Sequence, residues 1–89
     1  MRTIRKGLEE IIFEGFDWSD HLEQNETIAE SEWTIDFGLT PGSSTYDQTS
    51  TEIELSGGTQ NDTYKCQNRV TTTMDAVYEK SFKVMVIER

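Results

Sequence analysis

The chain has 89 residues, 34% of them hydrophobic, and a formal net charge of −9. A domain of this size withdraws only about 60 to 65% of its unfolded surface from water, so one thin core fits and a deep cavity with its own lining does not. The first 45 residues carry 3 basic and 10 acidic side chains, which repel phosphate backbones and anionic lipid heads. We therefore expect neither nucleic acid nor a membrane surface as partner.

The opening residues 1–15 scatter hydrophobic side chains among charges. We expect them to form an N-terminal arm or a first strand, ahead of a domain that spans residues 16–89. The segment from Ile11 to Trp18 is aromatic and β-branched, which favours a strand. Ser19 is a fair N-cap, so one helical turn is expected between Trp18 and Glu23.

The middle of the chain predicts one strand followed by a turn. Trp33, Ile35 and Phe37 alternate with polar residues and indicate a strand that ends at Gly38. The stretch from Gly38 to Ser44 has turn composition, and it contains a proline, which cannot donate to a β-ladder.

Two strands stand out in the second half of the chain. Ile53 and Leu55 alternate with glutamates in a half-buried strand, which a glycine pair at residues 57–58 terminates. A longer strand follows, and its expected inward side chains are Tyr64, Cys66, Asn68, Val70 and Thr72. The inward Asn68 is either hydrogen-bonded near the end of the sheet or marks a bulge, and both alternatives stay open.

The final strand is expected from Val77 to Ile87, after a reversal at residues 73–76, and should pair antiparallel with the strand before it. Its expected inward side chains are Phe82, Val84 and Val86. Met85 and Ile87 point outward, where they form either an exposed apolar strip or a surface covered by the N-terminal segment.

Turn signals about every ten residues, without helical periodicity, predict an all-β, immunoglobulin-like β-sandwich of about six or seven antiparallel strands. Tyr64 lies two residues before Cys66, the spacing of the tyrosine corner, so its hydroxyl should bond to upstream backbone near Gly58. The structural core should include Trp33, Tyr64, Cys66 and Phe82.

The sequence offers little for catalysis, and we expect neither enzyme activity nor a cofactor. His21 is the single histidine, and adjacency to Ser19 and Asp20 sends the three side chains in different directions. Burial should raise the pKa of the lone Cys66. One Cys and one His cannot close a structural zinc site. Seven carboxylates in residues 17–36 leave calcium open as an alternative to a solvated acidic face.

Binding to other proteins is the remaining role. The candidate interface combines the N-terminal segment with the last strand, and its hydrophobic residues are Ile4, Leu8, Ile12, Met85 and Ile87. No run resembles a signal peptide or a membrane span, so we expect assembly in a cytoplasm.

Several short segments occur in a distinctive order: Phe16–Leu22, Glu26–Ile28, Trp33–Ile35, Gly38–Thr40, Ile53–Thr59, Tyr64 and Val70–Thr73. This order resembles the immunoglobulin-like phage fibre-tail adaptor proteins, which are small virion structural proteins of tailed bacteriophages. The resemblance implies a virion component, assembled in the host cytoplasm, that joins fibres to the tail or portal region. It also implies other phage structural proteins as partners, multiple copies in a symmetric assembly, and no cofactor.

Two alternatives to a fibre-tail adaptor stay open from the sequence. The first is a capsid decoration protein, which copy number would distinguish. The second is a free-standing binding module that recognises a glycan or a surface protein through loops such as Gly38–Ser50.

Overall fold

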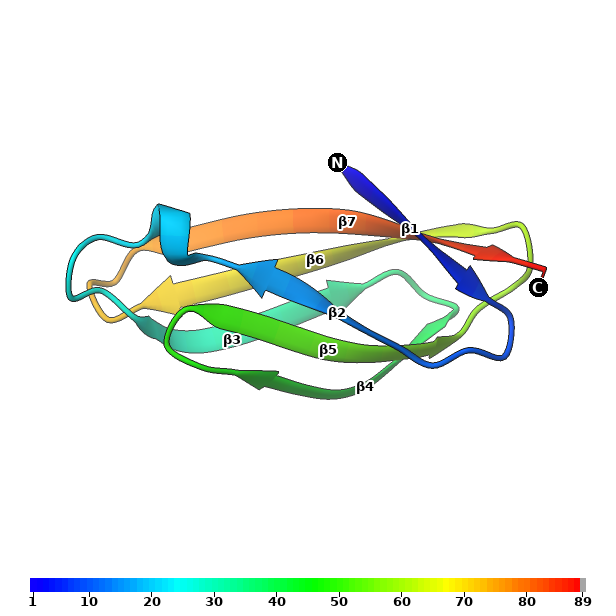
Figure 1. Ribbon diagram of the computed structural model, residues 1–89, viewed down its shortest axis with the longest axis horizontal. Coiled ribbons are helices and arrows are strands. Elements are labelled where there is room, and N and C mark those ends of the chain that lie inside the picture. The colour runs from blue at the N-terminus through cyan, green and yellow to red at the C-terminus, as the bar shows by residue number, and fades with distance from the viewer. Residues whose placement is uncertain (89) are drawn as a thin grey trace.

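The computed structural model describes residues 1–88, which form seven strands in two packed sheets (Figure 1). The four-stranded sheet has the order β1 (Arg2–Gly7), β7 (Val77–Ile87), β6 (Thr63–Thr72) and β3 (Ile28–Ile35). The three-stranded sheet has the order β2 (Ile12–Asp17), β5 (Ser50–Gly57) and β4 (Leu39–Tyr46). The prediction of an all-β sandwich is confirmed.

The single helical element within residues 1–88 is the short 3-10 helix η1 (Ser19–His21), close to the predicted helical turn. Over the same residues, no helix has the length and apolar character that crossing a bilayer requires.

The strand order matches that of immunoglobulin domains, except at the first strand. The orders β7-β6-β3 and β2-β5-β4 correspond to the G-F-C and B-E-D arrangements of immunoglobulin sheets. β1 pairs with β7 rather than with β2, and the pairing is parallel. The other four strand pairs are antiparallel, as predicted, and this parallel pair is the exception. Within this sheet β6 runs against both β3 and β7, so β1, β3 and β7 share one direction.

Alternation along β5, β6 and β7 builds the core as predicted. The buried main cluster consists of Leu39, Ile53, Leu55, Tyr64, Cys66, Phe82, Val84 and Val86. Of the expected core residues, Tyr64, Cys66 and Phe82 are buried, whereas Trp33 is half-buried and packs its ring 5.9 Å from that of Phe82. The fully buried tryptophan is Trp18, which belongs to a smaller cluster with Ile28 and Val70.

Tyr64 forms the backbone link that its spacing predicts. The amide of Thr59 donates a hydrogen bond of 2.8 Å to the Tyr64 hydroxyl, one residue beyond Gly58. The bond fixes the loop between β5 and β6 against the start of β6.

Asn68 is hydrogen-bonded, which decides between the two alternatives for this residue. Its register with β3 and β7 is unbroken, so no bulge occurs there, and it lies in the middle of β6 rather than at the sheet end. Its Oδ1 accepts from Trp18 Nε1 at 3.1 Å and from Thr51 Oγ1 at 2.7 Å. Its Nδ2 donates to Ser31 Oγ at 3.0 Å and to the carbonyl of Glu32 at 3.1 Å.

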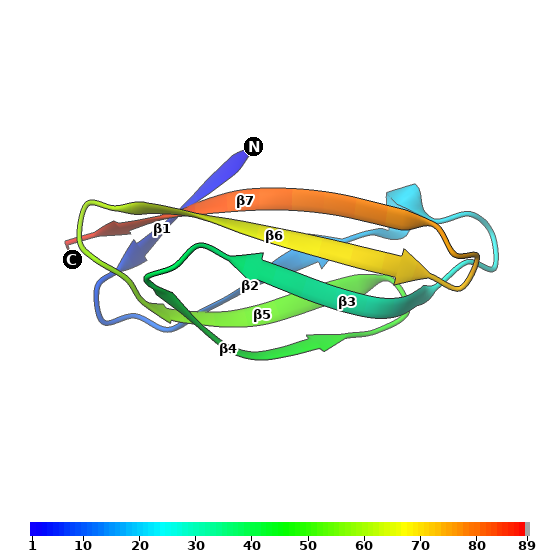
Figure 2. The ribbon, with the colours of Figure 1, turned by 180° about the vertical axis from the view of Figure 1, so that it is seen from behind.

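The turn expected from Gly38 to Ser44 is instead most of strand β4. This strand is paired on one side only, with β5, and its register shifts between Pro41 and Ser44. An edge strand tolerates a proline and a bulge because its outer backbone groups need no ladder partner. Figure 2 shows β4 and β3 as neighbouring edges of the two sheets.

Residues 1–15 contribute β1 and the first part of β2, so the expected boundary between residues 15 and 16 falls inside a strand. The fully buried Lys6 anchors β1, since its ammonium donates to the carbonyls of Gly7 at 2.8 Å, Leu8 at 3.2 Å and Gly57 at 2.8 Å. Burial lowers the pKa of Lys6, and the Glu10 carboxylate partly opposes that shift. The lysine thereby links β1 to the end of β5.

Candidate protein-binding surface

Cys66, the one thiol, is a packing residue. Its side chain is fully buried in the main cluster, and this burial, reinforced by the negative charge of Asp36, raises the pKa of the thiol to about 12. The reactive thiolate form is therefore scarce at neutral pH.

His21 lies on the surface in η1 and contacts aromatic rings instead of acids. Its ring centroid is 5.5 Å from that of Trp18 and 5.9 Å from that of Tyr78. No side-chain hydrogen bond joins His21 to a serine or a carboxylate within residues 1–88. The structure therefore does not bring His21, Ser19 and Asp20 together as a triad would require.

The first-half carboxylates do not converge. Within the described part of the chain, no group of three or more His, Cys, Asp or Glu side chains is placed to hold a metal ion. Three of these carboxylates are engaged by the fold. Glu26 accepts from the amide of Glu23 and from the hydroxyl of Thr72, Asp17 accepts from the amide of Ser19, and Asp36 accepts from the amide of Lys65.

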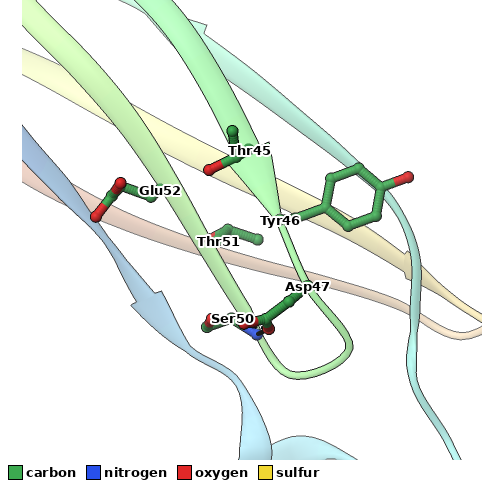
Figure 3. Close-up of a pocket in the computed structure, with 6 residues that line it drawn as sticks. All are labelled: Thr45, Tyr46, Asp47, Ser50, Thr51 and Glu52. Carbon is green, nitrogen blue, oxygen red and sulfur yellow. Dashed lines mark hydrogen bonds between the residues drawn. The ribbon is translucent and has the colours of Figure 1, made fainter.

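A shallow hollow of about 250 Å³ lies at the hairpin that joins β4 to β5, lined by Thr45, Tyr46, Asp47, Ser50, Thr51 and Glu52 (Figure 3). The Asp47 carboxylate accepts from the amides of Thr49 and Ser50 and from the Ser50 hydroxyl, which lowers its pKa. Tyr46 points away from the hollow, and its hydroxyl donates to the carbonyl of Ala29 on β3 at 2.9 Å. The polar groups here thus hold the hairpin and close the edge between the sheets.

Four of the eight exposed large hydrophobic side chains within residues 1–88 lie at or near one end of the sandwich. The loops after β1, β3 and β5 share this end, where β7 also ends (Figure 1). Leu8 and Ile11 lie in the first loop and are 44% and 60% exposed, and Phe13 follows at 57% on the outer face of β2. Phe37, between β3 and β4, is fully exposed. We call Leu8, Ile11, Phe13 and Phe37 the apolar end.

Protein interfaces typically bury large aromatic and aliphatic side chains, so the apolar end is the candidate contact surface of the chain. Residues 6–85 match the model of the family described as Podophage GP4 fiber-tail adaptor protein gp77. The chain belongs to this fiber-tail adaptor family. No curated protein matches it.

The family match confirms the resemblance seen in the sequence. It covers β2 to β6 completely, β7 up to residue 85, and the last two residues of β1. The chain is thus a structural protein of a tailed bacteriophage. The adaptor family supplies the setting for the exposed side chains, since an adaptor acts through its surface.

The five expected interface residues of this adaptor differ in their exposure. Leu8 is exposed at the apolar end, whereas Ile4 and Ile12 are half-buried and pack against the main cluster. Met85 and Ile87 are half-buried on the outer side of β7, opposite Arg5 and Gly7 of β1.

Three members of the apolar end were absent from the sequence-based interface: Ile11, Phe13 and Phe37. The alternation of side chains along β2 could have identified Phe13. Ile12 and Phe16 lie on the inward face of this strand, so Phe13 lies on the outward face. For Phe37 the alternation with Trp33 and Ile35 pointed to a buried position, although the strand ends at Ile35.

Proposed function

We propose that this chain joins fibres to the tail of a podophage-type virion as a non-catalytic connector, present in several copies and assembled in the host cytoplasm. The observation that carries the proposal is the match of residues 6–85 to the fiber-tail adaptor family. The packing roles of Cys66 and Asn68 support a connector, because the interior is used for stability.

The apolar end is the proposed contact with a tail or fibre protein. Phe37 offers a whole aromatic ring for insertion into a partner, and aromatic anchors of this type dominate binding energy at interfaces. Ile11 and Leu8 extend the apolar contact along the neighbouring loop. The surface is rimmed by Glu9 and Glu10, which favour a partner with basic residues around an apolar pocket.

The test changes exposed residues of the apolar end in the phage that carries this chain. Phe37→Ser and Ile11→Ser should produce particles that have lost this protein, its fibres or both, as measured by quantitative mass spectrometry of purified virions. Val77→Ser is the matched control, because Val77 is 48% exposed at the other end of the sandwich.

Control particles should keep the native ratio of fibre to tail protein. Full fibre content in the Phe37 and Ile11 variants would refute the apolar end as the contact. A copy number that follows the capsid lattice, instead of the tail, would refute the adaptor role in favour of capsid decoration.

A further inference from the structure

The two sheets of the sandwich differ completely in basic residues. No Lys or Arg occurs between Lys6 and Lys65. All three strands of the three-stranded sheet lie in this interval, so that sheet has no cationic side chain of these types. Within residues 1–88, every Lys and Arg lies on β1, β6 or β7 of the four-stranded sheet.

The outer face of the three-stranded sheet is acidic along its central strand. Glu52 and Glu54 alternate with the buried Thr51, Ile53 and Leu55, so both carboxylates point outward. Opposite Glu52 lie Gly15 on β2 and Thr45 on β4, which are small and leave that carboxylate accessible. Neither glutamate forms an ion pair with another described residue.

The outer face of the four-stranded sheet contains a pair of like charges. Lys65 on β6 lies directly opposite Lys83 on β7, and both side chains are exposed. Neither has an ion-pair partner in the described part of the chain. Like charges directly across a ladder destabilise a sheet. In a chain with 17 acidic and 8 basic residues, this costly pairing of two lysines indicates an anionic partner.

We propose that Lys65 and Lys83 of one copy bind the Glu52 and Glu54 face of a second copy. The chain itself supplies both halves of the contact, on the opposite outer faces of the two sheets (Figure 1). A contact between two different faces is heterologous. A pair of copies therefore leaves one basic face and one acidic face unoccupied, and further copies can add to them to form a ring or a row.

The pairwise contact should be weak. The acidic sheet measures roughly 14 Å by 27 Å, which is about half of the roughly 800 Å² that each partner buries in a stable complex. Copies held side by side on a tail would gain strength from their effective concentration. The inference rests on the proposed adaptor role, which places several copies next to one another on the tail.

The experiment measures self-association of the purified full chain by sedimentation velocity. K65E/K83E has two acidic faces, and E52K/E54K has two basic faces. Each variant alone should associate at least about tenfold more weakly than the native chain, because paired charges become repulsive. A mixture of the two variants should form a mixed complex, since an acidic face again meets a basic one.

Salt and a charge-matched variant complete the design. Native association should decline between about 0.02 M and 0.5 M salt, because screening shortens the range of exposed charges. D20K/E23K changes the net charge as much as E52K/E54K does but lies in and directly after η1, away from both faces, and it should associate like the native chain.

A native chain that stays monomeric at all concentrations, or association that the reversals leave unchanged, would overturn the proposal. A mixture that forms no mixed complex would do the same. These outcomes are measured without fibres or tails, so they leave the adaptor role itself intact, and loss of fibres from the apolar-end variants bears only on that role.

Discussion

Asn68 and Trp18 are fully buried and joined by a hydrogen bond of 3.1 Å from the indole N–H to the amide oxygen. The same oxygen accepts from Thr51 on the opposite sheet. A single amide on β6 thus holds the segment after β2 and the central strand β5, and it links the two layers of the sandwich.

Asn68→Leu should lower the free energy of unfolding by roughly 2 to 4 kcal/mol, because the buried Thr51 hydroxyl loses its acceptor and the Trp18 indole N–H keeps only its 3.4 Å hydrogen bond to that hydroxyl. Urea unfolding followed by tryptophan fluorescence measures the change. The control is Gln67→Leu, which alters the outward neighbour on the same strand and should stay within about 0.5 kcal/mol. An Asn68→Leu variant with an unchanged free energy of unfolding would show that the amide is not needed for stability.

Gly15 is required by the approach of β2 to β5. A Cβ at this position would contact the Thr51 carbonyl oxygen and would lie 2.7 Å from its carbon. Gly15→Ala must therefore separate the two strands, and we expect a loss of about 3 kcal/mol or more in thermal or urea unfolding.

Gly42→Ala is the matched control for Gly15. A Cβ at residue 42 meets mainly the flexible carboxylate of Glu54, which can rotate away. Its cost should be below about 1 kcal/mol. Equal effects of the two alanines would contradict the close approach of β2 to β5 at Gly15.

Acid should destabilise the sandwich through Glu26. Hydrogen bonds from Thr72 and then from the Glu23 amide lower its pKa from the ordinary value of 4.5. A carboxylate with a lowered folded pKa contributes stability above the unfolded pKa and loses it as pH falls through the folded value. Unfolding measured from pH 7 to pH 3 should therefore show stability declining below about pH 4.5.

Glu26→Gln should be less stable than the native chain at pH 7 and should show a flatter decline in acid. The exposed Glu52→Gln serves as control and should keep the native profile. If Glu26→Gln keeps the full acid dependence, the stabilising bonds of Glu26 are not the cause. Asp17 and Asp47, whose pKa values are lowered by amide hydrogen bonds, would then account for it.

Cys66 should be protected from thiol reagents while the protein is folded. With its pKa raised to about 12 by burial, labelling by a disulfide reagent at pH 8 should be slow and limited by unfolding. Addition of urea above the unfolding midpoint should give complete labelling within the mixing time. Rapid labelling of folded protein would contradict the buried position of the thiol.

Regular alternation explains which parts of the fold were predictable. Ile53, Leu55 and Phe82 follow a period of two, and the structure buries all three. The spacing between Tyr64 and Cys66 also predicted the hydrogen bond between the Tyr64 hydroxyl and the backbone a few residues upstream, which the Thr59 amide donates. Local pattern is sufficient where one face of a strand is fully buried.

Tertiary context decided the features that the pattern missed. The stretch from Gly38 to Ser44 has turn composition, and only the edge position of β4 beside β5 makes most of it a strand. Gly38, with a φ of 111°, redirects the chain after β3 and leaves Phe37 in solvent. Lys6 finds its carbonyl partner Gly57 51 residues away, which no local signal foretells. Which side chains around the start of β2 are exposed depended on the phase of the alternation, and an error of one position exchanges the half-buried Ile12 with the exposed Ile11 and Phe13.

The adaptor role is tested most directly by a localised cryo-electron microscopy reconstruction of the tail in intact virions. We predict copies of this seven-stranded sandwich between tail and fibre, with Phe37 and Ile11 covered by a neighbouring protein. Density for the sandwich on the capsid shell, or a tail that binds its fibres without this chain, would contradict the adaptor role.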